Sequence, residues 1–241
     1  MKKTVRNPIW LAIDTPDAKK AAELIKTVGP FVGGLKVGLE FISANGPKGV
    51  AAVVKTKLPV FADVKFHDIP NTVAGAVRAM AQLGVSMVNV HAAGGAAMLR
   101  AAMQAVAGMK RRPAIIGVTV LTSLEAADLA ATGIQGTPQE QVVRLAKLCQ
   151  ECKLDGVVCS PLEIAAVREA CGPKFVIVTP GVRPKGSEQG DQRRVMTPRE
   201  VLQAGANIMV IGRPITAAAN PADAAKAILG HLQGWPQAKR A

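Results

Sequence analysis

The segment Phe61-Ala62-Asp63-Val64-Lys65-Phe66-His67-Asp68-Ile69-Pro70-Asn71-Thr72 runs an apolar strand into a short polar loop, just ahead of a predicted helix. Side chains two apart on a strand share one face, so we expect Asp63 and Lys65 to project together from apolar surroundings. Removing such ions from water costs roughly several kcal/mol per ion, and apolar residues would fill a structural place more favourably. The pattern therefore favours a charged reaction site. The alternative is an ion pair that closes a barrel layer.

The same pattern of a strand followed by a helix recurs along the whole chain. Hydrophobic periodicity predicts strands at residues 9–14, 34–39, 60–66, 87–92, 114–121, 156–160, 175–179 and 208–212. It predicts helices at residues 17–28, 47–57, 72–83, 96–107, 138–153, 161–170, 198–204 and 221–232. Short strands separated by helices cannot pair as hairpins, so the sheet is expected to be parallel with right-handed crossovers.

Eight strand-helix units predict an α/β fold of one specific kind, a single (β/α)8 TIM barrel that occupies residues 1–241 as one domain. An open doubly wound sheet is the alternative. No Gly-x-Gly-x-x-Gly motif follows the first strand, which removes the main sign of a dinucleotide site. The sequence contains no evident linker, low-complexity tract or second domain.

The distribution of apolar residues argues against a membrane protein. No uninterrupted apolar stretch approaches the roughly 18 residues that a membrane helix needs. The basic segment 1–6 enters the first strand too early to be a signal peptide. We therefore expect a soluble, cytoplasmic protein with no membrane partner.

The formal net charge of +13 raises the possibility of a nucleic-acid partner. Lys and Arg are spread through every predicted helix, and the few aromatic residues do not alternate with basic ones as a base-stacking platform requires. Attraction for an anionic small molecule explains the charge at least as well. The sequence thus predicts no nucleic-acid partner, with an RNA-binding barrel as the alternative from another class.

The four cysteines lie within one short stretch, at Cys149, Cys152, Cys159 and Cys171. The spacing Cys149-x-x-Cys152 allows a zinc or redox site as an alternative. Each cysteine ends a predicted helix or strand, where a small buried apolar residue fits in a reducing compartment. We expect no metal site, and His67 and His91 also make a poor ligand set.

Polar residues gather where the predicted strands end, and in such barrels the chemistry takes place at that rim. Lys36, Asp63, Lys65 and Asp68 would follow one another with alternating charge. Such an arrangement holds an ammonium group rigidly, as the stabilisation of a developing negative charge requires. It also suits Lys65 to act as a general acid.

The last strand ends in Gly212-Arg213. Barrels often bind phosphate in the loops after strands seven and eight, where Gly admits a close backbone approach and Arg offers a planar set of donors. Arg213 could instead cap a helix or pair with a surface carboxylate.

Several motifs together resemble those of the orotidine 5'-phosphate decarboxylase family. They are Leu-Ala-Ile-Asp14, Gly34-Leu35-Lys36-Val37-Gly38, the segment from Asp63 to Thr72, Thr179-Pro180-Gly181-Val182-Arg183-Pro184 and Ile211-Gly212-Arg213-Pro214. The resemblance spans nearly the whole chain. Asp-x-Lys-x-x-Asp is shared with sugar-phosphate decarboxylases and synthases on the same barrel, whereas Phe-His-Asp-Ile-Pro-Asn-Thr and the loop after Arg183 resemble the bacterial branch.

The resemblance implies decarboxylation of orotidine 5'-phosphate to UMP, the last step of de novo pyrimidine synthesis, without a metal or organic cofactor. Lys65 would stabilise and then protonate the C6 carbanion, and Asp63 would sit against the departing carboxylate, mainly positioning Lys65. The other implied binding roles are ribose for Asp14 and Lys36, the pyrimidine edge for Thr122 and Ser123, and phosphate for Arg183, Gln192, Gly212 and Arg213, with Pro180 also in the substrate site.

The resemblance also implies a homodimer in which Asp68, Ile69 and Thr72 reach into the partner's site, with Asp68 taking part in catalysis there. The segment 182–196 would be a loop that closes over the phosphate, since loops of this length in compact domains are usually functional or disordered. The nearest alternative is a metal-dependent sugar-phosphate decarboxylase or synthase of the same barrel superfamily.

Overall fold

Eight short strands pair side by side in sequence order and close into a ring, with β8 returning to pair with β1. Every one of the pairings is parallel. The computed structural model describes residues 7–184 and 196–232. The strands are β1 Ile9–Ile13, β2 Gly34–Gly38, β3 Val60–Phe66, β4 Met87–His91, β5 Ala114–Val118, β6 Gly156–Val158, β7 Val176–Thr179 and β8 Ile208–Ile211.

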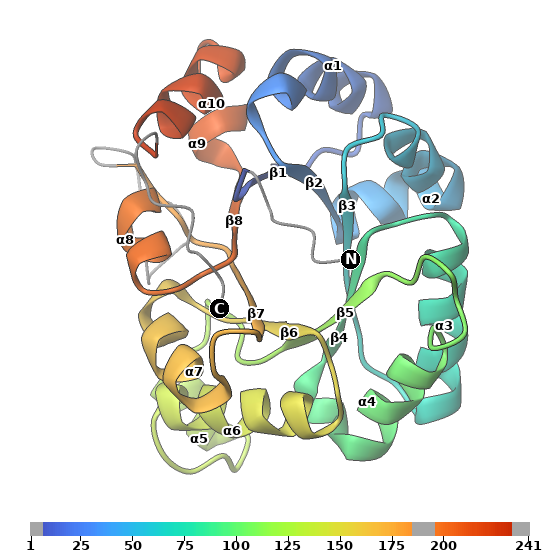
Figure 1. The fold of residues 1–241 in the computed structure, drawn as a ribbon, viewed down its shortest axis with the longest axis vertical. Coiled ribbons are helices and arrows are strands. Elements are labelled where there is room, and N and C mark those ends of the chain that lie inside the picture. Colours follow the sequence, from blue (N-terminus) through green and yellow to red (C-terminus); the bar gives the residue numbers. More distant parts are fainter. Residues whose placement is uncertain (1–6, 185–195, 233–241) are drawn as a thin grey trace.

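The helices surround this ring on its outside, as Figure 1 shows. They are α1 Ala18–Val28, α2 Leu39–Val54, α3 Pro70–Gln82, α4 Gly95–Gln104, α5 Ala126–Ala131, α6 Pro138–Glu151, α7 Ile164–Cys171, α8 Pro198–Gln203, α9 Arg213–Thr216 and α10 Pro221–Gly230. Single 3-10 turns occur at Gly29–Phe31, Ala92–Gly94 and Pro161–Glu163. This architecture confirms the predicted single (β/α)8 barrel. None of the described helices has both the length and the hydrophobicity that crossing a lipid bilayer takes.

Alternation along the strands produces two separate apolar cores. Outward-facing residues such as Leu11 and Leu35 pack with the helices in the larger core. Inward-facing residues fill the lower part of the barrel: Trp10, Ala12, Phe61, Met87, Ile116, Val178, Ile208 and Val210. Gly34 makes room for this filling, because a Cβ there would lie 2.6 Å from the Trp10 ring. The barrel is therefore packed solid below its carboxyl-terminal end, and only that end is open to chemistry.

A polar layer lies on top of the apolar filling. Asp14, Asp63 and Asn89 each stand two positions after one of the inward-facing apolar residues that fill the barrel. Side chains two apart on a strand share a face, so these three also point into the barrel. Lys36 joins them from β2, where it lies in register between Ala12 of β1 and Phe61 of β3. The fold thus brings four polar residues from four consecutive strands to one mouth.

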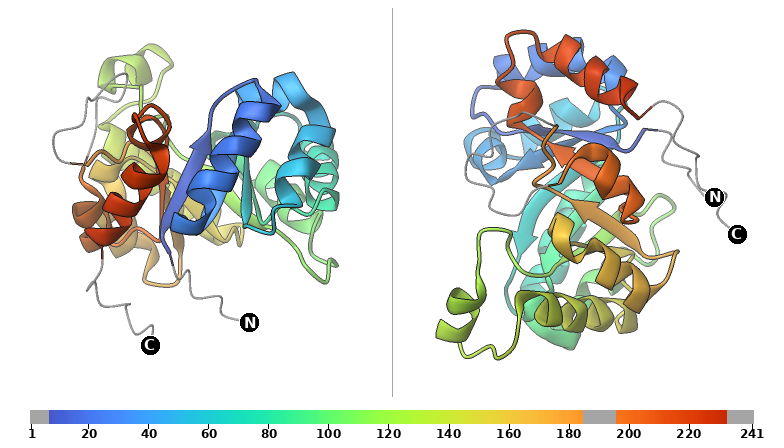
Figure 2. Two further views of the ribbon diagram at one scale, coloured as in Figure 1. Left: turned by 90° about the horizontal axis from the view of Figure 1, so that it is seen from above. Right: turned by 90° about the vertical axis from the view of Figure 1, so that its left-hand side faces the viewer.

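Helix boundaries differ from the predicted ones where local chain geometry decides them. α2 begins at Leu39 and contains a break at Gly46, whose φ of 58° lies in the left-handed region that glycine adopts easily. Pro47 follows this break, which is the start that the sequence predicted for the helix. The short helices α5 and α9 were not predicted, and Figure 2 shows α5 and its flanking segment standing out from the barrel.

Candidate active site

Four charged side chains form a continuous chain across the carboxyl-terminal mouth of the barrel. Lys36 Nζ lies 2.8 Å from Asp14 Oδ1 and 3.4 Å from Asp63 Oδ2. Asp63 Oδ1 in turn lies 2.7 Å from Lys65 Nζ. The order Asp14, Lys36, Asp63, Lys65 alternates in sign, so each buried charge has an opposite neighbour that offsets the loss of hydration.

Exposure changes along this chain of charges. The side chains of Lys36 and Asp63 are 10% and 14% exposed, whereas that of Lys65 is 30% exposed. Lys65 is thus the cation that Asp63 holds in place and whose side chain is still partly exposed at the mouth of the barrel. An ammonium group fixed in a site with little water is suited to stabilising negative charge on a bound molecule.

Asp63 is kept ionised by its partners. Burial by itself would raise the pKa of the Asp63 carboxyl, but the charges of Lys36 and Lys65, together with hydrogen bonds from Lys65 and Asn89, lower it overall. The carboxylate therefore stays negative at neutral pH and can hold the Lys65 amine. No other described carboxylate contacts Lys65, since the ion pairs of this rim include none between Lys65 and Asp68.

Within one subunit, the alternating order that the sequence predicted thus holds for Lys36, Asp63 and Lys65. Asp14 extends it at the Lys36 end, and Asp68 makes no ion pair with Lys65 of its own chain. Asp68 is exposed, and its Oδ1 accepts a hydrogen bond from the backbone N–H of Ile69 at 2.7 Å. Ile69 and Thr72 are exposed beside it, at the start of α3. Among the described ion pairs and hydrogen bonds, none joins these three side chains to the charges of their own barrel.

A pair of arginines follows strands β7 and β8. Arg183 is buried while Arg213 is exposed, and they lie close enough that the charge of Arg213 acts on Arg183. Burial and then this like charge lower the pKa of the Arg183 guanidinium. Two cations held together at strand ends favour an anion between them, as the predicted phosphate site requires.

The segment that starts at Val182 has its two ends paired with each other. Val182 and Met196 form an isolated parallel bridge, and the backbone N–H of Arg183 donates to the Met196 carbonyl at 3.0 Å. The base of the predicted 182–196 loop is therefore closed beside Arg183. Gln192 and the rest of residues 185–195 lie outside the described part of the chain.

Comparisons with known proteins agree on one family. The sequence model of the "Orotidine 5'-phosphate decarboxylase / HUMPS family" matches residues 7–228. The chain belongs to this family. It is 57% identical over 234 residues to an orotidine 5'-phosphate decarboxylase from Moorella thermoacetica, which covers 95% of this chain and 93% of the relative.

Two further relatives extend this agreement. An orotidine 5'-phosphate decarboxylase from Paramagnetospirillum magneticum is 49% identical over 231 residues, covering 94% of this chain and 98% of the relative. The solved structure of orotidine 5'-phosphate decarboxylase from Lactobacillus acidophilus superposes with a TM-score of 0.83 at 32% identity, covering 94% of this chain and 99% of that one. Membership of the decarboxylase family thus holds in both sequence and fold.

The remaining predicted site residues lie where strands β5, β7 and β8 end. Thr122 and Ser123 occupy a turn after β5, which ends at Val118 and so is shorter than predicted. Pro180 follows β7 directly, and Gly212 follows β8. A Cβ on Gly212 would lie 3.7 Å from Asp14 Oδ2, so this glycine borders the charged chain of the decarboxylase-family site.

Sequence reasoning missed Asn89. This side chain is fully buried on β4 and hydrogen bonds both to Asp63 and to the backbone of Lys65. The available signal was a single amide within the otherwise apolar run Met-Val-Asn-Val. Next to it, His67 and His91 stack with ring centroids 5.2 Å apart.

The expected reading of the cysteines agrees with the structure. Cys149, Cys152, Cys159 and Cys171 are all buried free thiols, and burial, with smaller contributions from Cys152 and Cys171, raises the pKa of the Cys149 thiol to about 12. Residues 7–184 and 196–232 contain no cluster of three or more His, Cys, Asp or Glu side chains placed to hold a metal ion.

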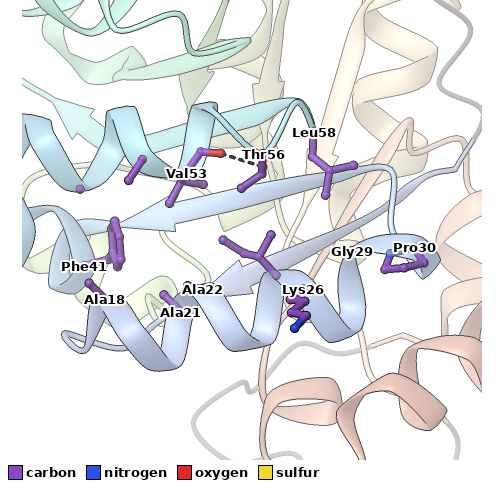
Figure 3. A pocket seen from close by; sticks show the side chains of 13 residues that line it. Ala18, Ala21, Ala22, Lys26, Gly29, Pro30, Phe41, Val53, Thr56 and Leu58 are labelled. Carbon is purple, nitrogen blue, oxygen red and sulfur yellow. Dashed lines mark hydrogen bonds between the residues drawn. The ribbon is translucent and has the colours of Figure 1, made fainter.

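A large cavity lies elsewhere, on the outer surface between α1 and α2 (Figure 3). Its volume is about 450 Å³, and its lining includes Ala18, Ala21, Phe41, Val53 and Leu58. This lining is almost wholly apolar and lacks convergent polar groups, so the cavity offers no chemistry. The charged mouth of the barrel is therefore the candidate active site, despite the size of this outer cavity.

Proposed function

We propose that this protein decarboxylates orotidine 5'-phosphate to UMP by electrostatic stabilisation from its own side chains. The observation that carries the proposal is the Lys65 ammonium, held 2.7 Å from Asp63 at the open end of a barrel whose lower half is filled with apolar side chains. The family match over residues 7–228 supports the same substrate class.

The chemistry explains why a fixed cation is needed. Breaking the bond between C6 of the pyrimidine and its carboxylate leaves an electron pair in an in-plane orbital at C6. The ring carbonyls cannot delocalise this pair directly, so the protein must stabilise the charge by electrostatics. A preorganised ammonium in a site shielded from water does so without reorganisation during the reaction.

Lys65 then completes the reaction as a general acid. The bond from C6 to the carboxylate breaks, CO2 leaves, and the electron pair on C6 takes a proton from Lys65 Nζ. The products are UMP and CO2, and the neutral amine regains its proton from solvent. No electron acceptor or donor is needed in this sequence of steps.

Asp63 is proposed to act mainly by positioning. Its Oδ1 accepts a hydrogen bond from Lys65 and its Oδ2 faces Lys36 at 3.4 Å, so one carboxylate locates two amines. It would also sit against the departing carboxylate of the substrate. Repulsion there could strain the ground state, but the contacts of Asp63 support the positioning role more directly.

Substrate binding is assigned around this centre. Asp14 and Lys36, joined at 2.8 Å, would bind the ribose hydroxyls, and Thr122 and Ser123 would bind the pyrimidine edge, with Pro180 nearby. The phosphate would lie with Arg183, Arg213 and Gly212, and Gln192 would contribute from the 182–196 segment. Closure of that segment over the phosphate would exclude water and couple remote binding to the chemical step.

A homodimer would complete each site. Ile69 is 68% exposed although it is a large apolar residue, and Leu39, 54% exposed, follows the neighbouring strand β2. Two large exposed apolar residues after neighbouring strands support a protein interface at this part of the rim. We propose that Asp68, Ile69 and Thr72 reach into the partner's site, where Asp68 would add its charge beside the partner's catalytic lysine.

The competing proposal on the same barrel is a metal-dependent sugar-phosphate decarboxylase or synthase. It predicts that a chelator abolishes activity, whereas the proposed mechanism predicts turnover in its presence. The decisive assay follows the pyrimidine absorbance of orotidine 5'-phosphate with purified protein and excess EDTA. Turnover under these conditions supports the proposal, and folded protein without turnover contradicts it.

A further inference from the structure

One amide interrupts the apolar interior of β4. Asn89 is fully buried, and its neighbours Val88 and Val90 are buried apolar residues. A buried amide is unfavourable unless its donors and acceptor are paired. Asn89 meets this requirement with contacts to two residues of the neighbouring strand β3.

The pairing of β3 with β4 is irregular at this point. Ala62 pairs with Val88, and the next pair is Phe66 with Val90, so residues 63–65 of β3 lie opposite Asn89 alone. Lys65 has a φ of 51°, in the left-handed region that side chains other than glycine seldom adopt. Such a conformation persists only where surrounding contacts hold it, and such sites cluster at catalytic centres.

The side chain of Asn89 supplies those contacts. Its Oδ1 accepts a hydrogen bond from the backbone N–H of Lys65 at 2.7 Å, in place of a regular strand partner. Its Nδ2 donates to Asp63 Oδ1 at 2.7 Å, the same oxygen that accepts the Lys65 ammonium. One amide therefore fixes both the backbone from which Lys65 projects and the rotation of the carboxylate that holds its amine.

We infer that Asn89 is a positioning residue of the decarboxylation, which aligns the Lys65 ammonium and the Asp63 carboxylate before substrate binds. This inference rests on the proposed function. Its hydrogen bonds within the described residues go to Asp63 and to Lys65, and none goes to a residue proposed to bind the ribose, the pyrimidine edge or the phosphate. Its effect should therefore be on the chemical step and not on binding. A purely structural amide would instead affect stability alone.

Two substitutions separate the two hydrogen bonds. Asn89→Leu has similar volume and removes both, and misplacement of a catalytic group by about 1 Å can cost about 100-fold in rate. We expect kcat for orotidine 5'-phosphate to fall by about 100-fold, with KM little changed. Asn89→Asp keeps an oxygen that can accept from the Lys65 backbone N–H but loses the N–H that donates to Asp63. It also places two carboxylates next to each other.

The pH profile of Asn89→Asp provides the specific readout. Two adjacent carboxylates cannot both ionise easily, so one of them takes up a proton at a higher pH than an isolated carboxyl would. That proton restores a donor between the two groups. The kcat of Asn89→Asp, relative to the native protein, should therefore rise as the pH is lowered from 8 to 5.

Asn207→Ala is the matched control. Asn207 Oδ1 also accepts from a strand backbone, that of Ile177 at 2.8 Å, and from Arg168, but it lies at the amino-terminal end of β8. This variant should lower the melting temperature and leave kcat unchanged. Thermal unfolding of all variants is measured alongside the kinetics, and assays are run well below each midpoint.

Native protein that does not turn over orotidine 5'-phosphate defeats the proposed function itself. Native turnover combined with kcat values within about threefold of native for both Asn89 variants overturns the positioning role. A loss of kcat that merely follows a loss of folded protein, with no pH-dependent recovery in Asn89→Asp, overturns it too. A large kcat loss in folded Asn89→Leu, unchanged KM and recovery of Asn89→Asp at low pH support it.

Discussion

At the scale of single residues, the site consists of one amine whose surroundings are almost entirely fixed. Lys65 is held by Asp63 through its side chain and by Asn89 through its backbone, while Lys36 holds Asp63 from the other side. All of these contacts are made between groups of the protein itself. The molecule is thus preorganised for stabilising charge, which is where electrostatic catalysis obtains most of its effect.

Lys65→Ala tests the role of this amine directly. The substitution removes both the stabilising charge and the proton donor, so kcat should fall by at least about 10,000-fold. The melting temperature should change little, because the side chain of Lys65 is partly exposed and packs no core. Steady-state kinetics and calorimetry measure the two effects. Unfolding of the variant with specific activity retained would instead identify the charged chain as structural.

His91 predicts a pH dependence of stability. Burial, then the charges of His67 and Lys65, lower the pKa of the His91 imidazole below its usual 6.5. The unfolded chain therefore binds this proton first, and stability that is complete above about pH 6.5 is lost as the pH falls toward the folded-state value. Urea unfolding between pH 5 and 7 should show this decline, and His91→Gln should flatten it. Equal slopes in both proteins would contradict the assignment.

At the scale of elements, the strands and the long helices could be predicted from the sequence, whereas the shortest helices could not. Periodicity alone was enough to predict eight strands and their helices, because each strand is a short apolar run and each long helix has an apolar face. α5 and α9 are too short to carry such a period. Capping makes α5 possible, through reciprocal bonds between Glu125 and Asp128, and such a local signal is invisible to hydrophobic periodicity.

The candidate site could be predicted only in part, because the sequence shows which residues end each strand but not which of them meet. The residue types at strand ends were visible, but which charges meet depends on register and on the irregular pairing of β3 with β4. That irregularity is a tertiary feature, because residues 63–65 lie opposite a single residue of another strand. The sequence therefore did not show that Asp14 would join the chain of charges next to Lys36, or that Asn89 would hold Asp63.

Gly34→Ala tests the packing of the barrel floor. The new methyl group would lie 2.6 Å from the Trp10 ring, so the strand or the indole must shift. Overpacking of this kind destabilises by about 1–3 kcal/mol. Chemical denaturation measures the free energy of unfolding. Gly230→Ala, at the end of α10 with no heavy atom within 4 Å, is the control and should be neutral or slightly stabilising.

At the scale of the whole molecule, the rim that carries the charges also carries exposed apolar residues. In the described part of the chain, the exposed large apolar residues are Leu39, Ile69 and Leu162, which follow β2, β3 and β6. β2 and β3 are neighbours in the ring, whereas β6 lies across it from β2. The neighbouring pair is where we expect the partner subunit to bind.

Ile69→Asp should therefore separate the subunits. An ionised carboxylate in an apolar interface is poorly solvated, so sedimentation velocity should show a shift from dimer to monomer. Activity should fall with it, since Asp68 and Thr72 would no longer reach the partner's site. Leu162→Asp, on the opposite side of the ring, should stay dimeric. A native protein that sediments as a monomer at assay concentrations would remove the shared site from the proposal.

The closing pair β1–β8 has a consequence for biosynthesis. Ile9–Ile13 leaves the ribosome well before its neighbour Ile208–Ile211 is synthesised, because the other six strands lie between them in the chain. Until then, β1 and β7 each present an unpaired edge that can template association with another chain. A product truncated before residue 208 should aggregate, and nascent chains of this enzyme should need shielding until β8 has been synthesised.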